Sequence, residues 1–298
     1  MQIIVPIKQV PETSAVKMDE ATGTMIREGV EAIVNPLDLY AIETALLLRE
    51  QHGGEVTVVS MGPPKADRAI REAIAMGCDR GVLISHKAFA GSDTWATSYA
   101  LAGAIRKLGA FDLVICGERA TDGDTGQVGP GIASFLDLPV ATYVGKIESV
   151  VCSPAAPAGG AASGANPSQG ARPGAAARLS SPKSVPHIRV HRLVEDGHEV
   201  LEVALPAVLT VVKEIANPRL PTLRGKQRAK AAEVPTWTPK DMLLDAAKLG
   251  LDGSPTRVVK IFKPKVAREC LKLAAGDEQS VAAAAEKLIE FLQARELI

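Results

Sequence analysis

Short apolar runs alternate with helical patterns through the first half of the chain, and this alternation constrains the fold more than any other feature. The strand-like runs, rich in Val and Ile, are residues 3–7, 55–60, 80–85 and 112–116. The helical patterns between them are residues 36–51, 65–76 and 94–108. Asn35 followed by Pro36 marks the first helix start, with the Asn side chain as cap. The sequence therefore predicts an α/β fold, with a mostly parallel, doubly wound sheet covered by helices on both faces.

The segment from residue 112 to residue 130 (DLVICGERATDGDTGQVGP) joins the fourth strand-like run to the next helical pattern. In a parallel sheet such a loop lies at the carboxyl end of a strand, where ligands bind. Its small residues let successive backbone N–H groups converge, and the helix start near Gln127 adds partial positive charge. The loop therefore suits a phosphate or pyrophosphate, although a Gly-rich turn of this kind is often only a turn.

Asp122 and Asp124 in this loop carry the wrong charge to face a phosphate. We expect the backbone donors to face the anion, while the two side chains shape the loop by bonding its own amides. The helix that follows begins either with Thr125 as its cap or later, with Pro130 at its first position.

The second half of the chain departs from the strand–helix alternation. Residues 152–186 are largely Ala, Gly, Pro and Ser and bury too little apolar surface to offset their ordering entropy, which predicts a low-complexity flexible insertion. The Asp196-Gly197 pair between two alternating runs predicts a hairpin. We expect the insertion and the hairpin to lie between sheet strands at residues 141–147 and 207–212.

Beyond Glu214 the sequence becomes Pro-rich and basic, which predicts an extended arm. The chain ends in a helical pattern at residues 278–297 with one apolar stripe, and such a helix packs on a neighbour or on its own domain. We therefore expect an α/β nucleotide-binding domain at residues 1–213, and a partner-docking arm with a C-terminal helix at residues 214–298.

Composition excludes several classes of function. The net charge is zero and aromatic residues make up 3% of the chain, which argues against nucleic-acid partners. No apolar run reaches the roughly 18 residues that span a membrane. The sequence enters a strand without a leader peptide, and its four cysteines lack metal-binding spacing, so we expect a cytoplasmic protein with buried, reduced thiols. No catalytic or metal-binding constellation stands out.

Five blocks resemble, in the same order, the β subunit of electron-transfer flavoproteins. They are residues 4–10 (IVPIKQV), 35–46 (NPLDLYAIETAL), 76–82 (MGCDRGV), 117–130 (GERATDGDTGQVGP) and 205–223 (LPAVLTVVKEIANPRLPTL). The resemblance covers nearly the whole chain except roughly residues 152–186, and it implies a Rossmann-like, adenine-nucleotide-binding fold. It also implies a heterodimer with an α subunit, which carries FAD in its own C-terminal domain and exchanges electrons with acyl-CoA dehydrogenase-type enzymes or similar redox partners.

The resemblance also implies which residues contact the nucleotide, although Pro6 and Met61 differ in type from some family members. These residues are Pro6, Asn35, Pro36, Leu37, Asp38, Met61, Arg119, Ala120, Thr121, Asp122, Gly123, Asp124, Thr125, Gly126, Gln127, Val128, Gly129 and Pro130.

The block at residues 88–98 (AFAGSDTWATS) resembles the branch of the family that carries a second FAD in the β subunit. Its implied cofactor contacts are Asp93, Thr94, Thr97 and Ser98. A helix cap formed by Ser92 or Asp93 would explain part of the block equally well. We favour FAD over AMP in the β-subunit site, with NADH as the possible electron donor and electron bifurcation as the possible activity.

The predicted arm carries a cluster of five basic residues: Arg219, Arg224, Lys226, Arg228 and Lys230. The stretch NPRLPTLRGK resembles the loop by which the family docks its dehydrogenases. The implied docking residues are Arg219, Leu220, Leu223 and Arg224, with Leu223 as the apolar anchor. The alternatives are a solvated arm and, for the whole protein, a non-redox nucleotide-binding module, which would need neither a docking loop nor a long C-terminal helix.

Overall fold

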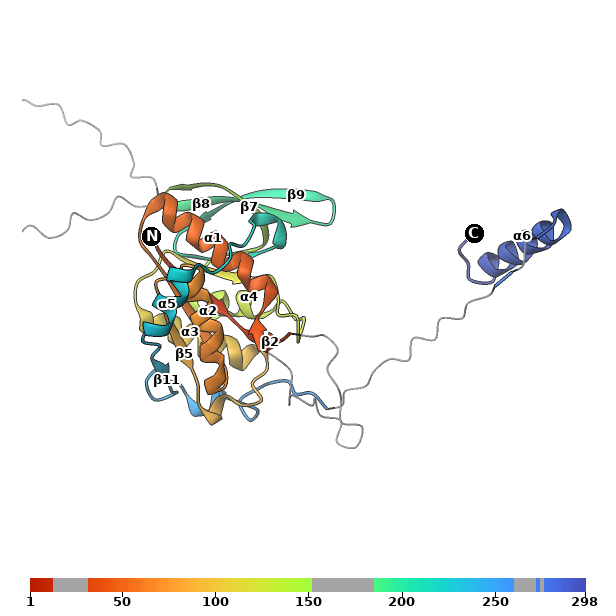
Figure 1. The fold of residues 1–298 in the computed structure, drawn as a ribbon. Helices are drawn as coiled ribbons and strands as arrows, with labels where there is room; N and C mark the ends of the chain where they lie inside the picture. Colours follow the sequence, from red (N-terminus) through yellow and green to blue (C-terminus); the bar gives the residue numbers. More distant parts are fainter. Residues whose placement is uncertain (13–31, 152–184, 260–271, 274–275) are drawn as a thin grey trace, which may run out of the picture. The chain divides into compact units, whose positions relative to one another are not determined.

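The computed structural model describes residues 1–12, 32–151, 185–259, 272–273 and 276–298. It forms two compact units, Met1–Val259 and Lys260–Ile298 (Figure 1). The second unit contains helix α6 (Glu278–Gln293), whose Asp277 side chain accepts a hydrogen bond from Ser280 N. Most of the predicted flexible insertion, residues 152–184, lies outside the described residues.

The first unit is built on a nine-stranded sheet. In spatial order its strands are β11 (Thr236–Trp237), β5 (Arg80–Ile84), β4 (Glu55–Met61), β1 (Gln2–Ile7), β6 (Leu113–Gly117), β10 (Ala207–Val211), β7 (Val140–Val151), β8 (His187–Val194) and β9 (Gly197–Ala204). Strands β11 to β7 pair in parallel, whereas β8 and β9 are antiparallel. The predicted α/β class is confirmed, and the predicted hairpin extends this sheet. Strands β2 (Gln9–Pro11) and β3 (Ala32–Val34) form a separate antiparallel pair.

Helices cover both faces of the sheet. Alternate residues of a strand point to opposite faces, so each strand contributes side chains to two cores. Ile3 and Val5 of β1 join a core with α1 (Pro36–His52), α2 (Asp67–Met76) and α5 (Leu223–Ala231). Ile4 of the same strand joins a second core with α3 (Thr94–Leu108) and α4 (Val128–Leu136). The described residues of the first unit also include four short 3₁₀ turns: Pro64–Ala66, Lys87–Phe89, Lys213–Ile215 and Ala246–Lys248.

The segment after Glu214 is not a simple extended arm, and this expectation was wrong. Thr222 caps α5 by accepting a hydrogen bond from Gly225 N. Arg228 of that helix donates to the carbonyls of Ile74 and Cys78, next to α2. Strand β11 then pairs with β5 at the sheet edge. Helix-forming Ala, Lys, Arg and Gln in α5, together with these long-range bonds, outweigh the prolines that flank the segment.

None of the helices in the described part of the chain is both long and apolar enough to cross a membrane.

Candidate functional site

Three parallel strands bring their carboxyl ends together where the chain changes direction across the sheet. From β1 the chain passes outward to β4 and β5, then returns through α3 to β6 on the other side of β1. Ligands of open α/β sheets bind at such a switch point. The predicted residues Pro6 and Met61 lie near the ends of β1 and β4, at the same edge as the loop that follows β6.

Gly117, the last residue of β6, sits against the first turn of α1. A Cβ at this position would lie 2.9 Å from the backbone carbonyl of Leu37 and even closer to Asp38 Oδ1. Only glycine allows this approach, so it holds Pro36, Leu37 and Asp38 beside the β6–α4 loop (residues 118–127).

Asn35 occupies the cap position of α1, which begins at Pro36 as predicted, but its side chain binds this loop instead of the predicted helix amides. Its Nδ2 donates to Asp38 Oδ1 and to the carbonyl of Arg119, both at 2.9 Å. Its Oδ1 accepts from Thr121 N at 3.1 Å, and no side-chain cap bond forms. The cap prediction was wrong because the side chain is fully buried against a loop that sequence distance conceals.

Asp38 completes the same network from the other side. Its Oδ2 accepts a 2.7 Å hydrogen bond from the backbone N–H of Lys8, the residue after β1. Burial raises the pKa of this carboxyl to about 7, although the hydrogen bonds from Asn35 and Lys8 act in the opposite direction. The ends of β1 and β6 and the start of α1 are therefore fastened together by two buried side chains, Asn35 and Asp38.

The two loop aspartates pair with cations. Lys8 Nζ lies 2.7 Å from Asp122 Oδ1, and Arg119 Nε lies 3.1 Å from Asp124 Oδ1. The expectation that the carboxylates bond the loop's own amides was wrong, because these cations offer them stronger partners. Asp124 itself adopts a left-handed backbone conformation with φ of 53°.

Helix α4 begins at Val128, between the two predicted starts. Gln127 occupies the cap position without a side-chain cap bond, and Pro130 is the third helical residue. Among the described residues, no protein group accepts a hydrogen bond from the backbone N–H groups of residues 125–129. Free amides at a helix start are the donors that an anion requires. Ala120 and Gly123 lie in the preceding turn, which the Asp124 N–H closes by donating to the Ala120 carbonyl.

Gly129 lets α4 approach the sheet, since a Cβ there would lie 2.5 Å from Thr210 Cγ2. The first turn of α4 is thus seated directly on the strand ends of the switch point.

The second predicted block begins α3 and lies beside the same loop. Thr94 Oγ1 donates to Gln127 Oε1 at 2.8 Å. Asp93 Oδ1 caps α3 through Ala96 N, while the buried Ser98 hydroxyl donates to the Thr94 carbonyl. Asp93 and Ser98 therefore stabilise the fold. The other two predicted contacts of this block, Thr94 and Thr97, are half-buried.

The predicted docking residues divide into two groups. Leu220 and Leu223 are 85% and 80% exposed, and Arg224 is exposed as well. Arg219 is instead bound within the fold: its Nε lies 2.8 Å from Glu43 Oε2, and its Nη1 lies 2.5 Å from Glu50 Oε1. The Arg219 backbone N–H also donates to Glu43, so this cluster, the Glu43–Arg219 clamp, fixes the main chain beside the two leucines.

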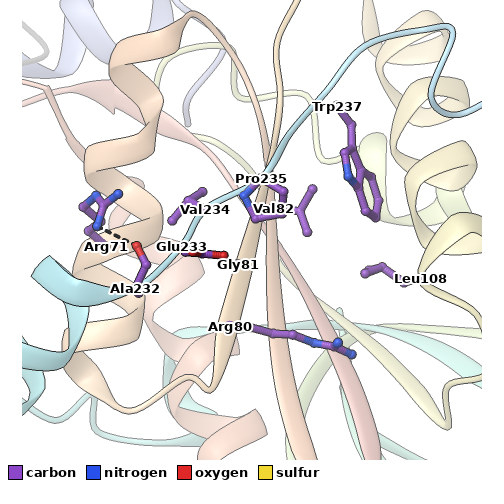
Figure 2. A pocket seen from close by; sticks show the side chains of 10 residues that line it. All are labelled: Arg71, Arg80, Gly81, Val82, Leu108, Ala232, Glu233, Val234, Pro235 and Trp237. Atoms are coloured by element: carbon purple, nitrogen blue, oxygen red, sulfur yellow. Dashed lines mark hydrogen bonds between the residues drawn. The ribbon is translucent and has the colours of Figure 1, made fainter.

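A cavity of about 520 Å³ lies elsewhere, between β5 and the segment from Ala232 to Trp237 (Figure 2). Its two arginines already have partners within the fold. Arg71 donates to the Ala232 carbonyl, the dashed line in Figure 2, and Arg80 pairs with Glu55. We therefore place the candidate site at the switch point, where donors are free.

Comparison with known proteins agrees with this architecture. The family model described as Electron transfer flavoprotein domain matches residues 22–156. An electron transfer flavoprotein subunit beta from Thermoanaerobacterium thermosaccharolyticum is 42% identical over 301 residues, covering 100% of both chains. The chain belongs to the β-subunit family of electron transfer flavoproteins.

Two further relatives extend the family. The caffeyl-CoA reductase-Etf complex subunit CarD of Acetobacterium woodii is 42% identical over 265 residues, 89% of this chain and 88% of its own. Protein FixA of Azorhizobium caulinodans is 42% identical over 274 residues, 90% of this chain and 86% of its own.

Sequence reasoning missed three side chains that pair with residues of the two candidate sites of this family member: Lys8, Glu43 and Glu50. Lys8 lies within the block IVPIKQV, two residues after the predicted contact Pro6, and its position directly after a strand was the available signal. No sequence signal marked Glu43, because a helical pattern does not distinguish a carboxylate that binds an arginine 176 residues away from one that faces solvent.

Proposed function

We propose that this chain is the β subunit of a heterodimeric electron carrier and that its switch point binds an adenine nucleotide. The row of free amides at residues 125–129 carries this proposal, because it offers donors and partial positive charge where three parallel strands end. Gly117 and Gly129 support the proposal indirectly, because they let α1 and the first turn of α4 pack closely against the strands at this edge of the sheet.

For the nucleotide we propose FAD, with AMP as the alternative. Both share the adenosine phosphate that the β6–α4 loop would hold, and when bound FAD supplies the two-electron and one-electron chemistry. Thr94 already joins its block to Gln127 of the loop, and we expect Thr94 and Thr97 to contact the longer ligand, whereas Asp93 and Ser98 are used by the fold. The role we propose for this flavin is electron bifurcation with NADH as the donor, and the similarity to CarD, a subunit of a caffeyl-CoA reductase-Etf complex, supports assembly with a reductase.

The partners we propose are an electron transfer flavoprotein α subunit and an acyl-CoA dehydrogenase or similar enzyme, in the cytoplasm. Residues 1–213 would then supply the nucleotide site and residues 214–298 the docking elements. The Glu43–Arg219 clamp and the exposure of Leu220 and Leu223 support this division, because an apolar pair held out on a fixed backbone suits a partner's pocket.

Flavin counting tests the proposal. The chain is co-produced with its α subunit, and the purified complex is reconstituted with excess FAD, after which FAD and AMP are quantified per heterodimer. Two FAD, with bleaching of the flavin by NADH, are the expected result. One FAD with one tightly held AMP would show a plain electron carrier, and one FAD with no second nucleotide would refute the site.

A further inference from the structure

Lys8 stands at the mouth of the candidate site with its backbone fixed from both directions. Its N–H donates to Asp38 Oδ2 at 2.7 Å, and its carbonyl accepts from Asn35 N at 2.8 Å. Its side chain is 48% exposed and crosses the sheet edge to Asp122. The main chain of Lys8 is therefore fixed, whereas its exposed ammonium group can exchange Asp122 for another anion.

The loop carboxylates disfavour an anion at this site as long as they stay paired with Lys8 and Arg119. Arg119 is held by Glu118 and Asp124, at 3.2 and 3.1 Å from its Nε. Together with Asp122, three carboxylates of one loop face two cations, Lys8 and Arg119, and the carboxyl of Asp38 lies beneath them. A phosphate that reaches the free amides must draw a cation away from a carboxylate.

The Lys8–Asp122 pair is the one suited to such an exchange. It is a single contact between partly exposed groups, and pairs of this kind contribute little to stability. A phosphate offers Lys8 more charge and more acceptor oxygens than one carboxylate does. The amides of residues 125–129 follow Asp122 along the same loop and into the first turn of α4, so we expect one ligand to reach both.

We propose that Lys8 is the phosphate-binding cation of this site and that Asp122 competes with the phosphate for it. The inference rests on the proposed nucleotide site and adds a means of selection. A ligand without a phosphate cannot displace Asp122 from Lys8, whereas one with a phosphate gains a cation in doing so. The carboxylate therefore lowers affinity for phosphorylated ligands and leaves affinity for the bare nucleoside unchanged.

The test compares AMP with adenosine on the complex of the full-length chain and its α subunit, freed of bound nucleotide. Calorimetric titrations are run on Lys8→Met, Lys8→Arg and Asp122→Asn, with Lys65→Met and Asp196→Asn as exposed controls. Lys8→Met is expected to weaken AMP binding by about tenfold or more, since it removes a charge-assisted hydrogen bond. Lys8→Arg should retain affinity within about threefold, because it keeps the charge. Asp122→Asn should tighten AMP by about threefold to tenfold, and adenosine affinity should stay constant in every variant.

The inference is overturned if Asp122→Asn weakens AMP as much as Lys8→Met does, because the pair would then only shape the loop. Equal losses for AMP and adenosine in Lys8→Met, or no loss at all, would also overturn it. Thermal unfolding of each variant separates a folding defect from a binding defect, and the retained charge in Lys8→Arg provides the second check. If the unsubstituted complex binds neither AMP nor adenosine, the proposed nucleotide site itself fails.

Discussion

The switch point and the docking segment (residues 219–223) both rely on ion pairs, but they use them in opposite ways. At the switch point, Lys8 and Asp122 meet through one exposed contact that a ligand can replace. At the docking segment, Arg219 binds a Glu43 side chain that is only 6% exposed, and the Arg219 backbone N–H joins the same carboxylate. Exposed single pairs leave a site adaptable, whereas a buried, multiply bonded pair fixes the main chain in advance of binding.

The largest effect on stability and nucleotide binding is expected from Gly117→Ala, which disturbs the packing of β6 against the first turn of α1. The new Cβ would press on the Leu37 carbonyl and on Asp38, and overpacking of this kind costs about 3 kcal/mol. We expect a lower melting temperature and a loss of AMP affinity of more than about a hundredfold. Gly145→Ala in β7 is the matched control, because it lies outside the predicted nucleotide contacts and its added Cβ would come no closer than 3.6 Å to Val212. Equal behaviour of the two variants would contradict the close packing at Gly117.

The pH dependence of stability should follow Asp38 and not the docking segment. Burial raises the pKa of Asp38 from 3.8 to about 7, so the folded chain keeps a proton that the unfolded chain releases near pH 4. This stabilising contribution is complete below about pH 4 and is lost as pH rises through about 7. We expect the free energy of unfolding to fall by about 2 kcal/mol between pH 5 and pH 7.5, relative to Asp38→Asn, in denaturant titrations. Parallel pH profiles for the two proteins would show that Asp38 does not titrate in this range.

Leu223→Ala should weaken docking without affecting the nucleotide site. An 80% exposed leucine gains little from its own fold, and removal of a binding hot spot costs about 2 kcal/mol, or roughly thirtyfold in apparent affinity. Electron delivery to the dehydrogenase, measured against partner concentration, reports this loss, and the melting temperature should not change. Leu243→Ala, at a residue that is 93% exposed, controls for exposed leucines in general. Unaltered delivery kinetics in Leu223→Ala would remove its docking role.

Glu43→Gln should produce a smaller loss by loosening the same segment. The substitution removes the buried charge that holds Arg219, so we expect docking to weaken by about threefold to tenfold while Leu220 and Leu223 remain present. Glu50→Gln is the control, because that carboxylate is 47% exposed and its pair should contribute little. If Glu50→Gln weakens docking as much as Glu43→Gln does, the buried part of the clamp has no special role.

The same comparison shows how far sequence reasoning reaches. The doubly wound sheet and the strand-to-helix loop after β6 were predictable, because they depend on local periodicity and on a Gly-rich turn, whereas ligand binding by that loop stays a prediction. Helix α5 was missed because flanking prolines concealed a helix held by contacts from α2. The Lys8–Asp122 and Arg219–Glu43 pairs span 114 and 176 residues, and no local pattern signals such partners.

Hydrogen exchange, followed by mass spectrometry at short labelling times, tests most directly whether the switch point holds the nucleotide. The amides of residues 125–129 have no acceptor within the described protein, so bound AMP or FAD should slow their exchange. We predict protection of peptides covering residues 119–131 and residues 6–9, and no change at residues 219–223 or 232–237. Protection confined to residues 232–237 and β5 would place the ligand in the cavity of Figure 2 and contradict a nucleotide site at the switch point.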